Sequence, residues 1–323
     1  MKKIILLLFP CIAFISACNK DVEEPSTEEI TYNVRLNFGG EINAFDSPLT
    51  KAGESDALFG IWIGKDGSKY NNKFGGGLFD NTDNIIVSFI SGHTYTVYCT
   101  LVSNGKAIVS HSSGSSPQYG PPFNYSNNTA AYVTNKLFYW NNVTGDTMFG
   151  NWTVMHREGY EFGITKPFNR RADRYFWKVT DYTPTENGTL NVELKHTVMG
   201  VKYRIAGLVD GSIALTVRIG EETIISESAI SSNGEGVGSV FECCDIVSAF
   251  DHPNTYKETA TVSIVWNRGI GVAQNLGSIS VDLLRNRMNV ININLGADDG
   301  GASLGINVDQ TDMTNESVTI EAS

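Results

Sequence analysis

Few residues of this chain have the types and spacing that enzymatic chemistry requires. Its five histidines (His93, His111, His156, His196 and His252) are scattered, and no His-Glu-x-x-His pair is present to hold zinc. No Gly-x-Ser-x-Gly sequence exposes a nucleophilic serine. Carboxylates are numerous, but spacing alone singles out no acid–base pair. We therefore expect no catalytic residue, no metal site and no cofactor, and we expect that the protein is not an enzyme.

Cys18 is the residue whose surroundings do predict chemistry. Two lysines open the chain, an apolar run spans Ile4 to Ile15, and two small residues precede Cys18. As a helix rising about 1.5 Å per residue, this run would span roughly 18 Å, well short of the roughly 30 Å core of a membrane. Residues 1–17 therefore have the pattern of a secretory signal peptide. Their small-small-Cys ending is similar to the bacterial lipobox, in which the cysteine receives a lipid and becomes the first residue of the mature protein. The alternative is an ordinary signal peptide beside a chance cysteine.

The charge and composition of the mature chain limit its possible binding partners and its mode of membrane attachment. The formal net charge is −11, which argues against nucleic-acid partners and against electrostatic binding to anionic membranes. Membrane attachment would then depend on the acyl chains, such as palmitate, carried by Cys18, and two or three such chains give stable anchoring. Residues 18–30 are polar and lack aromatic residues, so we expect a disordered tether.

Three cysteines remain once Cys18 is lipidated and Cys11 has left with the signal peptide: Cys99, Cys243 and Cys244. A disulfide framework would have an even number of spaced cysteines, and a zinc site would have a different ligand spacing. We expect all three to be buried as small hydrophobic residues.

The rest of the chain predicts short β-strands. Tyr32 to Phe38 alternates apolar and polar residues, as in a half-buried strand, and Gly39-Gly40 ends it. Only Asp245 to Phe250 suggests a turn or two of helix. Such strands at this spacing predict an all-β sandwich fold, and the length suits two domains, which we expect at residues 31–187 and 188–323, with the boundary near Pro184 to Gly188. The other predicted strands are Leu58–Ile63, Phe74–Phe79, Ile85–Ile90, Tyr95–Val102, Leu137–Trp140, Trp152–Met155, Leu190–Leu194, Val201–Ile205, Leu215–Ile219, Thr223–Ile230, Thr261–Trp266, Ser278–Leu284 and Asn289–Leu295.

An aromatic-rich middle allows a glycan-binding surface lipoprotein as the alternative function. Exposed rings stack on sugars, with neighbours such as Asn141, Asn142 and Asn151 bonding the hydroxyls, whereas buried rings would only fill the core. Exposure of the rings separates the two interpretations, and three coplanar exposed rings in one cleft would favour the glycan. The rings are Tyr119, Phe123, Tyr125, Tyr132, Tyr139, Trp140, Trp152, Tyr160, Tyr175 and Trp177.

Several stretches follow the lipobox in a characteristic order. They are the strand end Leu36–Gly40, the loop Leu49–Gly53, the strand Leu58–Ile63, and the later stretches Leu194–Lys202 and Leu284–Val290. Taken together over residues 1–295, this order resembles the fimbrillins and fimbrillin-associated lipoproteins of Bacteroidetes, which are type V pilus proteins.

The resemblance implies two transthyretin-like Greek-key β-sandwich domains in tandem. It also implies a location on the cell surface, anchored in the outer membrane through the lipid on Cys18. Asn19-Lys20-Asp21 is similar to the short charged signals that send lipoproteins of this phylum to the outer face. The implied role is cell adhesion or pilus (fimbria) assembly, with other pilus subunits as partners and a host surface or glycan as the adhesion target.

The resemblance further implies that a protease removes the first strand by cutting a loop that contains arginine or lysine. Here the bond would be Lys51–Ala52, although lysine stands where shaft subunits usually carry arginine. Loss of Tyr32 to Phe38 would expose unpaired backbone that a strand of the next subunit refills by β-augmentation, which is donor-strand exchange. Ile306 to Ile320 is the expected donor. Without cleavage, the protein would instead be an anchor or accessory subunit.

Overall fold

The computed structural model describes residues 29–42, 56–67, 73–108, 110–112, 117–120, 122–123, 132–139, 173–269, 273–298 and 301–313. Within these ranges most residues lie in β-strands. Its two helices are short, α1 (Gly105–Ile108) and α2 (Ile246–Asp251). None of the helices in the described ranges has the length and apolar character needed to cross a membrane.

The strands of the first half form two layers that meet at one corner. One layer has the order β4-β1-β10 and the other β9-β5-β2-β3-β8, with β10 and β9 bonded only at Lys195 and His196. A separate small ribbon consists of β6 and β7. The strands are β1 (Thr31–Gly40), β2 (Leu58–Lys65), β3 (Lys73–Phe79), β4 (Ile86–Ile90), β5 (Tyr95–Val102), β6 (Ser110–Ser112), β7 (Gln118–Tyr119), β8 (Phe138–Tyr139), β9 (Arg174–Tyr182) and β10 (Gly188–His196).

The second half also consists of two facing sheets. One has the order β14-β11-β18-β19, with β15 also paired to β11, and the other has the order β13-β12-β16-β17. The strands are β11 (Val198–Ala206), β12 (Ser212–Ile219), β13 (Glu222–Ile230), β14 (Gly234–Glu235), β15 (Ser239–Glu242), β16 (Lys257–Asn267), β17 (Ala273–Leu284), β18 (Met288–Asp298) and β19 (Gly301–Thr311).

The two halves repeat one strand order. The sheet β9-β5-β2-β3 corresponds to β17-β16-β12-β13, and β4-β1-β10 corresponds to the β14/β15-β11-β18 part of the other sheet. In each half the first strand runs parallel to the last: β1 to β10, and β11 to β18. The second half adds β19 to this shared order, and β19 pairs antiparallel with β18 over its whole length.

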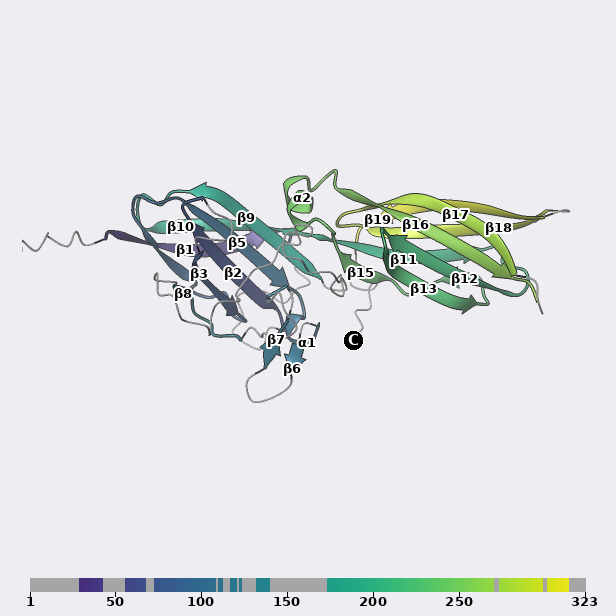
Figure 1. Ribbon diagram of the computed structural model, residues 1–323, viewed down its shortest axis with the longest axis horizontal. Coiled ribbons are helices and arrows are strands. Elements are labelled where there is room, and N and C mark those ends of the chain that lie inside the picture. Colours follow the sequence, from purple (N-terminus) through teal and green to yellow (C-terminus); the bar gives the residue numbers. More distant parts are fainter. Residues whose placement is uncertain are drawn as a thin grey trace, which may run out of the picture.

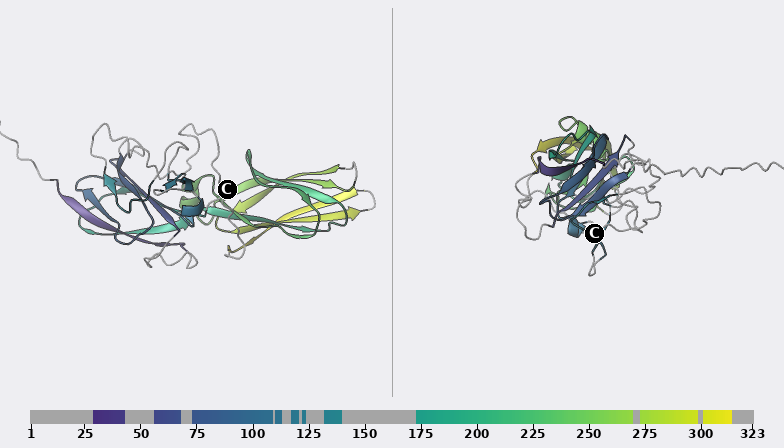
Figure 2. Two further views of the ribbon diagram at one scale, coloured as in Figure 1. Left: turned by 90° about the horizontal axis from the view of Figure 1, so that it is seen from below. Right: turned by 90° about the vertical axis from the view of Figure 1, so that its left-hand side faces the viewer.

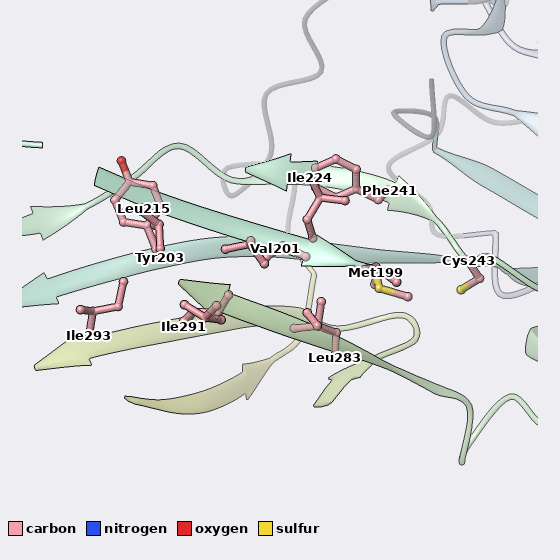
Figure 3. Packing of buried hydrophobic residues seen from close by; sticks show 14 of the residues in the cluster. Met199, Val201, Tyr203, Leu215, Ile224, Phe241, Cys243, Leu283, Ile291 and Ile293 are labelled. Carbon is pink, nitrogen blue, oxygen red and sulfur yellow. The ribbon is translucent and has the colours of Figure 1, made fainter. Parts of the chain in front are cut away.

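Alternating apolar residues explain why the strands bury one face. In β16 every second residue from Glu258 to Trp266 is buried, and Val262, Ile264 and Trp266 are fully covered. Figure 3 shows the resulting core of the second half, with Val201, Leu215 and other side chains of both sheets meeting between the layers. Burial of this kind is the main favourable term in folding such sheets.

The halves lie end to end, and Figures 1 and 2 show an elongated molecule with the first strands at one end and β16 to β19 in the other half. The chain passes from one half to the other at Thr197, where β10 leads directly into β11. We expected this passage near Pro184 to Gly188. It lies later because the strand after those residues, β10, pairs with β1 of the first half.

α2 joins the halves on one side. The helix lies where the sequence suggested a turn or two, and Asp245 caps it by accepting a hydrogen bond from the Ser248 N–H at 2.9 Å. Phe250 packs edge-on against Phe176 of β9, with ring centroids 5.7 Å apart. Lys178 and Asp251 form an ion pair at 2.7 Å between the same two elements. The helix therefore covers part of the outward face of the first-half sheet.

The cysteine expectation was right for Cys99 and Cys243, which are buried, and wrong for Cys244, which is exposed. Cys244 lies between the end of β15 and α2, outside any strand, and its N–H donates a hydrogen bond to the Glu258 carboxylate.

Candidate functional site: the first strand and the junction behind it

β1 is held along both of its edges. Val34 to Gly40 runs parallel to Gly188 to Leu194 of β10, and Thr31 to Arg35 runs antiparallel to Ile86 to Ile90 of β4. The predicted strand Tyr32 to Phe38 is therefore confirmed, and it lies inside the strand order. It is also the first described strand of the chain.

Side chains and a glycine fix β1 in this position. Val34 and Leu36 point into the first-half core and are fully covered. Gly40 ends the strand with φ of +102°, and a Cβ there would lie 2.3 Å from the Leu194 carbonyl oxygen. Only glycine permits this backbone conformation so close to β10. Gly39 differs, because its nearest neighbour would be the Glu193 carboxylate at 3.7 Å.

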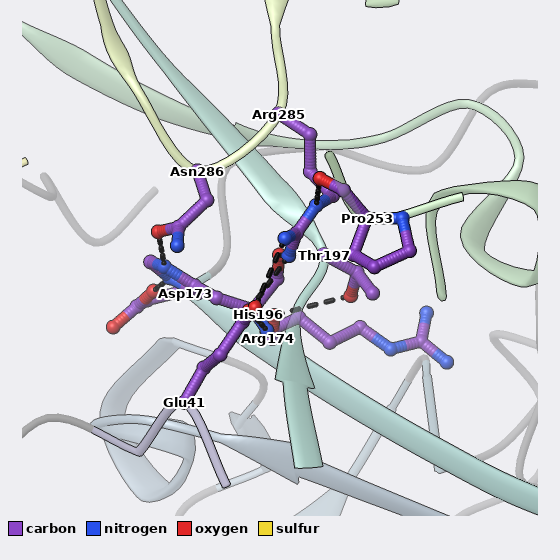
Figure 4. A network of polar contacts seen from close by, with 8 residues as sticks. All are labelled: Glu41, Asp173, Arg174, His196, Thr197, Pro253, Arg285 and Asn286. Atoms are coloured by element: carbon purple, nitrogen blue, oxygen red, sulfur yellow. Dashed lines mark hydrogen bonds and ion pairs between the residues drawn. The ribbon is translucent and has the colours of Figure 1, made fainter. Parts of the chain in front are cut away.

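The residue after β1 enters a buried polar network at the junction, shown in Figure 4. Arg285, in the turn between β17 and β18, holds both carboxylate oxygens of Glu41, with Nη1 2.8 Å from Oε2 and Nη2 3.1 Å from Oε1. Its Nε donates to the Pro253 carbonyl at 2.7 Å, and Nη1 also donates to the His196 carbonyl. The Arg285 side chain is 3% exposed. One guanidinium thus ties the first strand to the second half.

The charge of Glu41 is stabilised by this arrangement. Burial raises the pKa of its carboxyl, but the hydrogen bonds from Arg285 and from the His196 N–H outweigh burial, so the pKa lies below its ordinary value. The carboxylate is therefore ionised at neutral pH and paired with a buried cation, an arrangement that is costly to break from one side.

His196 carries a second arm of the network. Its Nδ1 is 2.7 Å from Asn286 Oδ1, its Nε2 bonds Asp173, and its ring stacks on Tyr175 with centroids 4.3 Å apart. Nearby, Arg174 is fully buried and bonds Glu242 of the second half at 3.1 Å.

Two of the stretches that carry the family resemblance, Leu194–Lys202 and Leu284–Val290, meet at this junction. The turn after Leu284 lies beside the passage from β10 to β11, where the Asn286 N–H donates to the Val198 carbonyl and the Gly200 N–H donates to the Arg287 carbonyl. Asn289 Nδ2 bonds the Gly200 carbonyl at 3.0 Å. Residues far apart in the sequence thus hold the turn between β17 and β18 against the start of β11.

Sequence reasoning missed the two residues at the centre of this network. Glu41 and Arg285 are separated by 244 positions, and neither belongs to a recognisable motif. Only their places, directly after Gly39-Gly40 and inside Leu284–Val290, could have pointed to them.

The predicted lipidation and processing residues, Cys18, Lys51 and Ala52, lie outside the described residues. The predicted donor Ile306 to Ile320 is described only up to residue 313. Its first part belongs to β19, which is paired with β18.

The described aromatic rings of the middle region are mostly core residues. Tyr119, Phe123, Tyr175 and Trp177 are buried. Tyr132 and Tyr139 are exposed, but Tyr139 accepts a hydrogen bond from the Ser88 N–H at 2.8 Å and packs edge-on against Phe74. Tyr125, Trp140, Trp152 and Tyr160 lie outside the described residues. The described rings therefore do not form the sugar platform of the alternative interpretation.

No cluster of three metal-binding side chains occurs among the residues that the structure describes.

Comparison with known proteins returned fimbrial structures. No protein-family model matches the chain, and no curated protein does. Among solved structures, it is similar to the fimbrial anchor protein Mfa2 of Porphyromonas gingivalis, with TM-score 0.36 and 9% identity over 86% of this chain and 97% of that one. It is also similar to the tip fimbrial protein Mfa3 of the same organism, with a C-terminal truncation, at TM-score 0.33 and 8% identity over 87% and 98%. A fimbrial assembly protein of Parabacteroides distasonis gives TM-score 0.35 and 10% identity over 88% and 100%. Likenesses of this size do not carry a functional argument, which has to come from the chain's own residues.

Proposed function

We propose that this protein is a non-enzymatic, lipid-anchored surface subunit of a fimbria that acts in adhesion or in fimbrial assembly. The observation that carries the proposal is the position of β1, which is the first strand and is paired along both edges inside a sheet. A removable strand in that position makes a joint between subunits. Cys18 would carry the lipid and anchor the chain in the outer membrane until cleavage of the Lys51–Ala52 bond separates the chain from it.

Cleavage of the Lys51–Ala52 bond would leave β1 attached by non-covalent contacts alone. Its departure would uncover the core beside Val34 and Leu36, at a cost of about 1.5–3 kcal/mol for each fully buried aliphatic side chain. It would also expose a row of unpaired backbone groups on β4 and on β10. An incoming strand with alternating apolar residues would restore both.

The donor strand would come from the C-terminal part of the next subunit. Because β19 is engaged with β18 from Gly301 to Thr311, we assign donation to the residues that follow it, which contain the alternating stretch Val318-Thr319-Ile320. The repeated strand order of the two halves supports our further proposal that each is a transthyretin-like Greek-key domain.

The proposal is tested by cutting the loop and supplying a donor. The intact chain, without its predicted signal peptide, is treated with a lysine-specific protease and mixed with a fluorescent peptide of residues 312–323. The expected result is release of the fragment that contains β1 and stable uptake of the peptide. The matched control is Lys51→Gln, which should retain β1 and take up no peptide. Equal uptake by both forms, or none by the cleaved form, would contradict strand exchange at β1.

A further inference from the structure

The outer edge of β10 has no strand partner over most of its length in the described part of the chain. β10 pairs with β1 through Gly188 to Leu194, and with β9 only at Lys195 and His196. The Leu194 carbonyl accepts from the Glu41 N–H on the β1 side. Since backbone groups alternate along a strand, those of Thr189, Asn191 and Glu193 point to the opposite edge.

The repeat in the fold indicates what such an edge accepts. β10 in the first half corresponds to β18 in the second, because each is the last strand of the shared order and runs parallel to the first. The outer edge of β18 is covered by β19, antiparallel, from Met288 opposite Thr311 to Asp298 opposite Gly301. The equivalent position beside β10 has no counterpart of β19 among the described strands.

The sequence of β10 matches that of β19. Thr189-Leu190-Asn191-Val192-Glu193 and Gly305-Ile306-Asn307-Val308-Asp309 share the order small, aliphatic, asparagine, valine, acid. The two stretches also share their orientation, because Leu190 and Val192 turn toward one core as Ile306 and Val308 turn toward the other. β10 therefore has both an open edge and the pattern of the strand that covers such an edge.

We propose that β10 pairs with β10 of a second copy of this chain, antiparallel about a two-fold axis through Asn191. In this register Asn191 lies opposite Asn191 of the second copy, and Thr189 lies opposite Glu193. The Asn–Asn pair also occurs between β18 and β19, where Asn292 lies opposite Asn307. The acidic residue of β19, Asp309, lies opposite Val290 there. Each of the three opposed pairs exchanges two backbone hydrogen bonds, because their N–H and C=O groups face one another.

Charge selects this register among those that a two-fold axis allows. An axis through Glu193 would set two carboxylates directly opposite each other, which destabilises a cross-strand pair. An axis through Thr189 would shorten the ladder, because the chain before Gly188 is a turn. The Asn191 register also extends a contact already present, since Asn37 Nδ2 donates to Asn191 Oδ1 at 3.0 Å. The four asparagines would form one row across the dimer.

The dimer would contain one continuous sheet in the order β4-β1-β10-β10-β1-β4. Because the two-fold axis makes each copy use the same edge, the two open edges cover each other and none remains for a third copy. The inference goes beyond the fimbrial proposal, because it requires neither cleavage of the loop nor loss of β1.

The test is the mass of the uncleaved chain in solution, measured by analytical ultracentrifugation on protein without its signal peptide and with Cys18 and Cys244 replaced by serine. We expect a concentration-dependent dimer. Asn191→Pro removes an N–H that faces the open edge and leaves the β1–β10 bonds in place, which is the position where a strand tolerates proline. It should raise the dissociation constant by about tenfold or more, as expected for the loss of a backbone hydrogen-bond pair.

Gln310→Pro is the matched control. By the same alternation its N–H points away from β18 at the exposed edge of β19, so the dimer should be unchanged. Equal melting temperatures would establish that both proline variants are folded. A monomeric parent protein, or a dimer that Asn191→Pro leaves intact, would overturn the proposal.

A disulfide gives an independent readout of the register. Asn191→Cys places two thiols opposite each other, at the roughly 5.5 Å Cα separation that a disulfide accepts, so oxidation should give a covalent dimer. Asn37→Cys is the control on the same face. Its thiols would be three strand spacings apart, roughly 14 Å, and should not cross-link. Equal cross-linking by both variants would contradict the register.

Discussion

Replacing Arg285 by methionine should break the connection between the first strand and the second half. The change keeps much of the side-chain volume but removes the guanidinium that serves Glu41, Pro253 and His196. A buried arginine removed from its partner typically costs 3–5 kcal/mol, and since the Glu41 side chain is 28% exposed and can take up water, we expect about 3 kcal/mol. At 2–4 °C per kcal/mol for domains of this size, the melting temperature should fall by about 6–12 °C.

Arg287→Met is the matched control, two residues further along the same turn. The Arg287 side chain is 47% exposed, and its partner Asp312 is 84% exposed. Exposed ion pairs contribute about 0–1 kcal/mol, so this variant should unfold close to the parent protein. Calorimetry gives the melting temperatures, and urea titration followed by tryptophan fluorescence gives the free energies of unfolding.

A double-mutant cycle with Glu41→Gln isolates the pair. If the two side chains act on each other, the double variant should be less destabilised than the two single changes added together, by about 1–2 kcal/mol. The reasoning is refuted if Arg285→Met costs less than Arg287→Met, or if Arg285→Met and Glu41→Gln are additive.

Two further predictions concern the same region. Gly40→Ala should destabilise the protein by about 2–4 kcal/mol, because a Cβ would meet the Leu194 backbone at a positive φ, whereas Gly39→Ala should be nearly neutral. Urea titration of both variants measures the two free energies of unfolding, and equal losses would mean that the strand end tolerates no substitution at either glycine. Folding lowers the pKa of the Glu41 carboxyl. The stability that its charge contributes to the folded state is therefore fully present above the ordinary pKa of 4.5, and it is lost as the pH falls through the lower folded value. Glu41→Gln should therefore make the acid limb of the melting-temperature profile shallower, and an unchanged limb would assign acid sensitivity to other carboxyls.

Strands with one solvated face could be predicted from the sequence because burial leaves an alternating pattern. This held for β1, in which the buried Val34 and Leu36 alternate with exposed neighbours. The bounds of β5 were also predicted as observed, Tyr95 to Val102, although Val97 to Val102 is buried throughout. It was less clear for β2, where Leu58 to Gly64 is buried on both faces and the strand has no alternation. The small ribbon of β6 and β7 was not among the predicted strands, since these are only three and two residues long and carry no periodic signal.

The junction could not be predicted, for a different reason. Arg285 and Glu41 are ordinary charged residues in turns, and their importance arises from burial and mutual contact across 244 positions. Periodicity reports which face of an element is covered and gives no information on which distant turn covers it. The similarity of β10 to β19 could not be interpreted from the sequence either. Five residues of similar type indicate a shared role only once the strand order shows that both strands lie at the edge of a sheet.

The central proposal, strand exchange at β1, is tested most directly by N-terminal mass spectrometry on protein purified from its own cell envelope. The account predicts polymeric material that begins at Ala52, with β1 removed. Material that begins entirely at acylated Cys18, with β1 retained in the assembled fibre, would contradict it.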